Sequence, residues 1–121
     1  MKKLLINVSL KSNSNTINIK TTGYLNEKEN YIIYKELDEN NTITKYYFRE
    51  NKLDRENNNM KLIYYFDILK STNGNVFIKD INQTLIMNIK TKKIESNDRH
   101  ILIKYCLNDE DYTYEITRVM K

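Results

Sequence analysis

Apolar and polar residues alternate along most of this chain with a period of two, rather than the 3.6 of an amphipathic helix. Every even-numbered residue from Leu4 to Leu10 is apolar, for example, whereas Asn7 and Ser9 fall on the opposite face. The clearest runs cover residues 85–94, 101–107 and 112–120. Val, Ile, Thr, Tyr and Phe dominate these runs, as they do on strand surfaces. The pattern therefore predicts β-strands and gives little support for long helices.

Clusters rich in Asn, Asp and Ser separate the runs, and these residues favour turns. They cover residues 11–15, 26–30, 38–41, 49–52, 56–59, 71–75, 96–99 and 108–111. Their spacing of about 8–12 residues is typical of an antiparallel meander, and closure of such a meander removes exposed edges. We predict a single all-β domain over residues 1–121, folded as a closed antiparallel up-and-down barrel of about 8–10 strands. A β-sandwich is the alternative.

The charge of the chain bears on its partners. With a net charge of +4 and a pI near 9.0, the chain could attract an anion. However, it has no Ala, Pro or Trp and is crowded with Ile, Asn, Lys and Tyr, the residues that A/T-rich codons encode. Most of its basic residues are Lys, not the Arg that binds phosphate in bidentate geometry. We therefore attribute the charge to codon composition and do not expect nucleic-acid binding.

The sequence also bears on the compartment. Cys106 is the only cysteine, which excludes an internal disulfide and suits a reducing compartment. The start "MKKLLINVSL" has an apolar run that ends at Asn7, shorter than the roughly 7–15 residues of a secretory core or the roughly 20 of a membrane span. We expect a cytoplasmic protein without a membrane segment. Monomer and homodimer both remain open.

Several segments, taken in order, resemble the YwiB-like family. They are the start "MKKLLINVSLK", the segment "IKTTGYLNEKENYIIYKE", the strand "KLDRE" with its Arg55, and "LIMNIKTKKIE" followed by "HILIKYCLNDEDYTYEITRV". The family consists of bacterial proteins of uncharacterised function, so the resemblance implies a calycin-like (lipocalin-like) barrel and no mechanism. The chain departs from the family at "DINQT", where a Gly-containing turn is usual, and aligns loosely over residues 56–80.

The chain offers little for catalysis. His100 and Cys106 fall on the same, less apolar face of one predicted strand, roughly 20 Å apart at about 3.3 Å per residue. They cannot form a nucleophile–base pair or share a zinc ion at that distance. The acidic clusters at Glu36–Glu39 and Asp109–Asp111 are interpreted as solvated turns, and the Tyr-rich segments 45–48 and 64–66 as barrel packing. We predict no catalytic residue, metal or cofactor, and a protein that is not an enzyme.

Two arginines share the inward face with apolar and aromatic residues. Arg55 is in phase with Leu53, and Arg118 is in phase with the tyrosines of the last strand. A charge that faces a barrel interior is costly unless it is paired, and it suits a small ligand; otherwise the arginine lies at the barrel mouth with its head in water. We predict a non-enzymatic barrel that binds a small, partly apolar ligand through Arg55, Tyr105, Tyr112, Tyr114 and Arg118.

A second hypothesis uses the outside of the barrel. The stretch "IKTKKIE" at residues 89–95 has three lysines. With a period of two, Lys90 and Lys92 face solvent, whereas Lys93 shares the inward face with Ile89 and is expected to reach water at the rim. Lys90 and Lys92, together with Arg99 and Lys104, would form a basic outer face for a protein or RNA partner. Salt-dependent retention of RNA would separate this hypothesis from the first.

Overall fold

A computed structural model describes residues 1–119 of the chain, and none of these residues is helical. They form ten strands: β1 (Lys2–Ser12), β2 (Thr16–Asn26), β3 (Tyr31–Lys35), β4 (Ile43–Tyr47), β5 (Lys52–Glu56), β6 (Met60–Tyr65), β7 (Thr72–Ile78), β8 (Gln83–Ser96), β9 (His100–Leu107) and β10 (Glu110–Arg118). Met120, in the last predicted run, lies outside the described residues.

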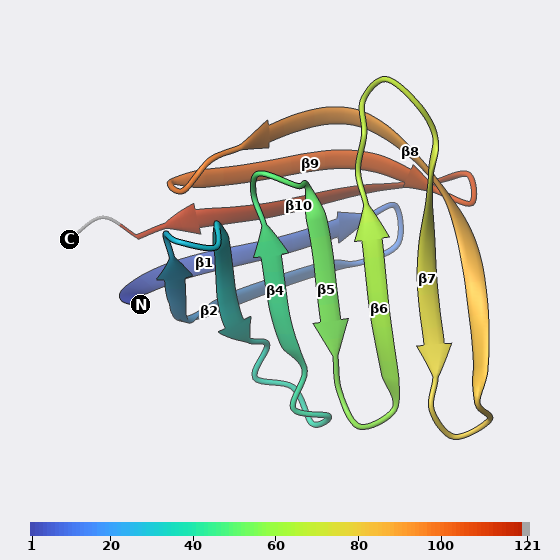
Figure 1. Cartoon of the computed structure of the whole chain (residues 1–121), viewed down its shortest axis with the longest axis horizontal. Coiled ribbons are helices and arrows are strands. Elements are labelled where there is room, and N and C mark those ends of the chain that lie inside the picture. The colour runs from blue at the N-terminus through green and yellow to red at the C-terminus, as the bar shows by residue number, and fades with distance from the viewer. Residues whose placement is uncertain (120–121) are drawn as a thin grey trace.

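The strands close into one antiparallel barrel. Each strand pairs with the next along the chain, and β1 pairs with β10 to complete the circle. The predicted all-β, up-and-down barrel is confirmed in place of a sandwich, and its order is consistent with the calycin-like architecture. The nine hairpin connections between the ten strands alternate between the two ends of the barrel, so five of them lie at one end. We call this the hairpin end; the other end, where β1 begins and β10 ends, is the terminal end (Figure 1).

The barrel is flattened into two layers whose strands cross. Figure 1 shows β3 to β7 as short arrows, aligned side by side and alternating in direction, in front of the longer β1, β2, β9 and β10. Strand β8 passes from one layer to the other, because Gln83–Ile89 pairs with β7 and Ile89–Ser96 pairs with β9. Similarly, β2 pairs with β1 from Thr16 to Leu25 but with β3 only from Gly23. The two layers therefore diverge at the hairpin end.

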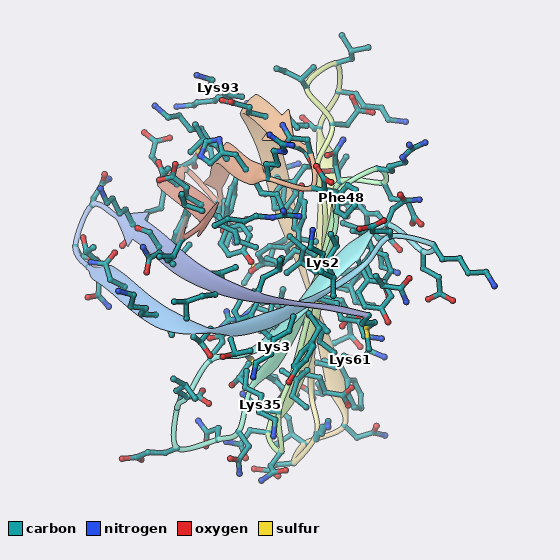
Figure 2. The ribbon with its side chains drawn as sticks, turned by 90° about the vertical axis from the view of Figure 1, so that its left-hand side faces the viewer. Lys2, Lys3, Lys35, Phe48, Lys61 and Lys93 are labelled. Atoms are coloured by element: carbon teal, nitrogen blue, oxygen red, sulfur yellow. The ribbon has the colours of Figure 1, made fainter. Side chains whose placement is uncertain are left out.

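A bulge in β8 changes the orientation predicted for Lys93. The pairing with β9 shifts between Thr91 and Lys93, so that Lys93 lies opposite the exposed Lys104 and Ile94 lies opposite the buried Ile103. A bulge adds one residue to a strand and reverses the alternation beyond it. The prediction that Lys93 faces inward was therefore wrong, and Figure 2 shows this side chain on the outside of the ribbon.

The turn predicted at residues 71–75 was also wrong. Strand β7 begins at Thr72, and the connection from β6 falls at residues 66–71. Gly74 lies within the strand and has no positive φ. A Cβ at this position would lie 2.5 Å from Cδ1 of Tyr64. The glycine is needed because the Tyr64 ring packs directly on the backbone of β7.

Asparagines form many of the tight turns, and all of those named next except Asn82 lie in the predicted clusters. Asn30, Asn41, Asn51, Asn82 and Asn108 all have φ between 47° and 60°, the left-handed region that Asn tolerates better than most residues. Leu37 has φ 59° without that tolerance. Its position is in the β3–β4 connection at the hairpin end, next to the site described below.

The core consists of inward-facing side chains from both layers. Ile6, Tyr46, Ile89, Ile101 and Ile103 are fully buried. Neighbouring tyrosines face opposite ways, as expected from the period of two, with Tyr64 buried and Tyr65 exposed. Aromatic rings contact one another within this core, and those of Phe66 and Tyr105 have centroids 4.9 Å apart.

Candidate functional site

The two predicted arginines lie at opposite ends of the barrel. Arg55 is the penultimate residue of β5, where that strand reaches the hairpin end, whereas Arg118 is the last residue of β10, at the terminal end. Both share the inward phase of their strands, as predicted. Because of this separation, they cannot bind one small ligand together. The sequence did not reveal the separation, because alternation along a strand determines the face of a residue but not its height in the barrel.

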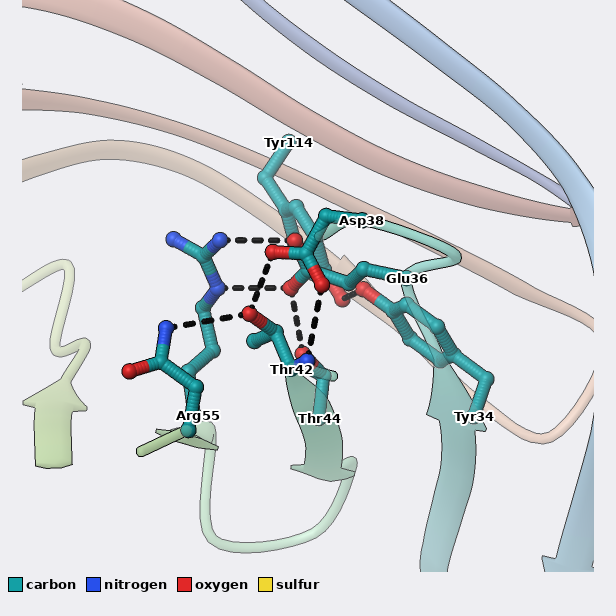
Figure 3. Close-up of polar contacts among 8 residues, drawn as sticks. Tyr34, Glu36, Asp38, Thr42, Thr44, Arg55 and Tyr114 are labelled. Carbon is teal, nitrogen blue, oxygen red and sulfur yellow. Dashed lines mark hydrogen bonds and ion pairs between the residues drawn. The ribbon is translucent and has the colours of Figure 1, made fainter. Parts of the chain in front are cut away.

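Arg55 forms a two-fold ion pair with Glu36. Its Nε donates to Oε2 of Glu36 at 2.6 Å and its Nη2 donates to Oε1 at 2.7 Å, while Nη1 takes no part (Figure 3). The side chains are 23% and 13% exposed, so solvent screens the pair only partly. Burial by itself would lower the pKa of Arg55, but the hydrogen bonds and charge of Glu36 raise it above its usual value.

A polar network in the β3–β4 connection holds Glu36 in place. Thr44 is fully buried, and its hydroxyl donates to Oε2 of Glu36 at 2.5 Å. The backbone N–H of Glu36 donates to the carbonyl of Thr42 at 2.9 Å. Asp38 closes the same loop by accepting from the hydroxyl and the backbone N–H of Thr42, and these bonds lower the pKa of Asp38. The acidic cluster predicted to be a solvated turn therefore supplies the partner of Arg55.

Two buried tyrosines from opposite layers meet beside this pair. The hydroxyls of Tyr34 and Tyr114 lie 2.5 Å apart, and either can donate to the other. Burial raises the pKa of both tyrosines well above the usual value, so both remain neutral. Figure 3 shows the two rings approaching from β3 and from the layer behind it, next to Glu36. The bond ties the two crossing layers together at this point.

A cavity of about 220 Å³ lies against the Arg55–Glu36 pair. Its wall is aliphatic and aromatic apart from this pair, and both layers contribute to it. The lining residues are Val8, Leu10, Ile17, Ile19, Glu36, Leu53, Arg55, Leu62, Tyr64, Tyr105, Leu107, Tyr112 and Tyr114. Ile17 is an inward-phase residue that remains 45% exposed, so the cavity opens to solvent at the hairpin end.

Four of the five predicted site residues line this cavity. Besides Arg55 and Tyr114, they are Tyr105 and Tyr112, whose rings stack with centroids 5.4 Å apart and planes 14° apart. Tyr112 lies nearer the rim, where its hydroxyl donates to Oε2 of Glu110 at 3.0 Å. Sequence reasoning missed Glu36. A signal was present, since Glu36 continues the inward alternation of Ile32 and Tyr34.

Arg118, the fifth predicted residue, does not line the cavity. Among the described residues, its Nε and Nη2 are buried without a hydrogen-bond partner, and the nearest carboxylate, that of Asp98, is 3.9 Å from Nη2. Its placement on the inward face agrees with the prediction, but the structure separates it from the cavity that the other four residues line.

The other candidate groups lie on the outside of the barrel. His100 contacts two carboxylates there, with Nε2 2.6 Å from Glu115 and Nδ1 3.3 Å from Glu95. These partners raise the pKa of His100 despite the opposing effect of burial. Cys106, on the same outer face, is a free, half-buried thiol. Within residues 1–119, no group of three or more His, Cys, Asp or Glu side chains is arranged to hold a metal ion.

The same residues contain no helix of sufficient length and hydrophobicity to cross a membrane.

Known proteins resemble this chain in structure rather than in sequence. No protein-family model and no curated protein matches it. Among solved structures, the barrel is similar to the crystal structure of the ywiB protein from Bacillus subtilis, with a TM-score of 0.63 over 98% of this chain and 91% of that chain. This chain has the ywiB fold. The sequence identity is 20%, so the likeness to YwiB-like proteins that the sequence predicted is confirmed for the fold and assigns no function.

Proposed function

We propose that this protein is a non-enzymatic binding module that holds a small, partly apolar ligand in its barrel. The observation that carries the proposal is the cavity at the hairpin end, which places one Arg–Glu pair against an otherwise aliphatic and aromatic wall. Ligand sites commonly combine an apolar wall with a few polar groups that fix orientation. A barrel whose interior served only packing would be filled by side chains at this point.

The energetics of the ion pair support a role in binding. Removing two charges from water costs free energy that their attraction does not reliably offset, and apolar replacements of similar size are often as stable. Arg55 and Glu36 are only 23% and 13% exposed, so they carry part of this cost. The guanidinium of Arg55 and the tyrosine hydroxyls beside it give the cavity directional contacts that an aliphatic wall would lack.

Several features support binding rather than catalysis. The side chains best suited to nucleophilic or acid–base chemistry, Cys106 and His100, lie outside the barrel rather than against the cavity. The carboxylate that does reach the cavity, Glu36, already accepts from Arg55 and Thr44. We also infer that the protein acts in the cytoplasm, because its single free cysteine suits a reducing compartment.

Ligand-observed NMR with a library of small aromatic and branched aliphatic compounds tests the proposal. Leu107→Trp narrows the cavity from a half-buried position at its rim. Leu5→Trp adds the same side chain on the outside of the barrel and serves as the matched control. We expect compounds that bind the wild type and Leu5→Trp but not Leu107→Trp. Absence of any such compound, or equal binding by both variants, would remove the proposal.

A second candidate function is an interaction through the basic outer face. The bulge supports it, because both Lys92 and Lys93 face solvent and Lys93 lies directly opposite Lys104. An ion pair between Lys92 and Asp111, 2.7 Å apart, counts against it because it neutralises part of the positive charge of this face. Filter binding of RNA at two salt concentrations is decisive, because affinity based on phosphate contacts falls steeply with salt. Retention that is absent or independent of salt would exclude this candidate.

A further inference from the structure

The charges that line the cavity cancel. Among the described residues that line it, Arg55 and Glu36 are the two with a full charge, and they are bonded to each other through both oxygens of the carboxylate. We infer that the cavity selects neutral ligands whose polar end both donates and accepts hydrogen bonds, such as a primary amide, and that Glu36 sets this preference. The inference rests on the proposed function, because it specifies the ligand class of the same site.

An anionic ligand is disfavoured by Glu36. A carboxylate placed against Arg55 would lie a few ångströms from the Glu36 carboxylate, in a site where solvent screening is weak. Arg55 already directs Nε and Nη2 at Glu36, so the bidentate geometry that makes arginine a strong carboxylate receptor is in use. The ligand would therefore lose its hydration and gain little net attraction.

A cationic ligand is disfavoured for the corresponding reason. The oxygens of Glu36 accept from Arg55, and Oε2 accepts from Thr44 as well. A second cation would have to approach within a few ångströms of the Arg55 guanidinium. The pair thus opposes a full charge of either sign near it, while leaving individual hydrogen-bonding positions open.

Those positions match a neutral group with a donor and an acceptor. Nη1 of Arg55 takes no part in the ion pair, and Figure 3 shows it directed away from Glu36. Tyr64, on the strand beside that of Arg55, and Tyr105, from the other layer, also line the cavity, and neither hydroxyl forms a hydrogen bond with another described side chain. An amide carbonyl can accept from Nη1 while its NH₂ donates to a tyrosine hydroxyl. Leu53, Leu62 and the stacked tyrosine rings then surround an apolar or aromatic body.

A matched series of naphthyl compounds tests the inference without mutation. Naphthamide, naphthoate and naphthamidinium have the same shape and differ in charge, and their fluorescence is readily followed because the chain has no Trp. We expect the wild type to bind naphthamide about tenfold more tightly than either ion, which corresponds to about 1.4 kcal/mol. Tighter binding of naphthoate or naphthamidinium than of naphthamide would overturn the inference and leave the proposed function intact.

Glu36→Gln then tests the role assigned to that residue. Glutamine keeps the shape and an acceptor for Arg55 but removes the negative charge, so naphthoate should bind at least as tightly as naphthamide. Glu56→Gln is the matched control. It changes the net charge equally, but Glu56 pairs with Lys79 on the exposed surface at the same end of the barrel. An equal gain in naphthoate affinity in both variants would assign the effect to overall charge and overturn the role of Glu36.

The failure of the proposed function is separately recognisable. If none of the three compounds competes with another or shifts the NMR signals of Tyr105 and Tyr112, the cavity does not bind such ligands, and both the function and its ligand class are refuted. If Glu36→Gln does not fold, the wild-type series alone decides the ligand class, and Glu36→Gln combined with Arg55→Gln tests the charge balance. That variant is neutral at the cavity and should again prefer naphthamide to naphthoate.

Discussion

The hydrogen bond between Tyr34 and Tyr114 predicts a specific pattern of stability in a double-mutant cycle. The hydroxyls lie 2.5 Å apart, and each residue is only 3% exposed. Replacing one tyrosine by phenylalanine leaves the other hydroxyl buried beside its lost partner. An unsatisfied buried polar group costs about 1–3 kcal/mol, whereas replacing both partners by apolar groups of the same shape can be nearly neutral. The ring contacts, including that of Tyr114 with Tyr46, persist in phenylalanine.

We therefore expect Tyr34→Phe and Tyr114→Phe each to lower the free energy of unfolding by about 1–3 kcal/mol. The double variant should lose no more than the more damaging single variant, which gives a coupling of about 1–3 kcal/mol. For a domain of this size, 1 kcal/mol corresponds to about 3–6 °C in the midpoint of thermal unfolding. The two single variants should thus melt clearly below the wild type.

Urea unfolding followed by far-ultraviolet circular dichroism measures the cycle. The slope against urea should be the same in all four proteins, so that the shifts in midpoint report stability alone. A double variant that loses the sum of the two single effects would show that the hydroxyls are not coupled. That result would refute the reasoning, because it would mean that each hydroxyl is satisfied independently of the other.

Three further predictions concern the barrel and its charges. Arg55→Met should lower the free energy of unfolding by about 3 kcal/mol, because it leaves Glu36 partly buried without its partner. Arg118→Met should leave the urea midpoint unchanged or raise it, because it removes Nε and Nη2, which are buried without a hydrogen-bond partner in residues 1–119; equal losses in the two variants would contradict this. Gly74→Ala should lower the free energy of unfolding by about 1–3 kcal/mol, because the added methyl group overpacks against the Tyr64 ring. Thermal melts should show a smaller loss for Gly23→Ala, because its closest contact is the movable Cδ1 of Ile6. The raised pKa of His100 implies a stabilisation that is fully present below the unfolded-state pKa of about 6.5 and is lost as pH rises through the higher folded-state pKa. The melting temperature of the wild type should therefore fall more between pH ~6 and pH ~8 than that of Glu115→Gln, which lacks the main partner of His100; parallel pH profiles would argue against this contact.

The alternation of residue types was sufficient to predict much of the fold. A period of two places successive side chains on opposite faces, so it identified the strands and the inward phase of Arg55, Tyr105 and Tyr114. The Asn-rich turns set hairpin-length connections, which lead to an up-and-down order with neighbouring strands paired. The same pattern placed His100 and Cys106, the side chains best suited to catalysis, on the outside of the barrel.

The pattern was insufficient wherever an extra residue or a close approach decided the local structure. The bulge at Lys92 reversed the phase of the following residues, and nothing in the alternation of "IKTKKIE" distinguishes a bulge from a lysine at the rim. The Ser- and Asn-containing cluster at residues 71–75 indicated a turn, yet Gly74 within it lies in a strand and makes room for Tyr64 on another strand. Both cases depend on a partner strand that the local sequence does not specify.

The sequence by itself determined that this chain forms a closed β-barrel with Arg55 and several tyrosines turned inward, because side-chain direction in a strand depends only on local position. The tertiary structure decided which of these residues meet. Arg55 finds Glu36, 19 residues earlier in the chain, while Arg118 on the same inner face lies at the other end of the barrel. Strand register, the bulge in β8 and the crossing of the two layers set the height of each side chain, and an ion pair forms only between groups brought to the same height.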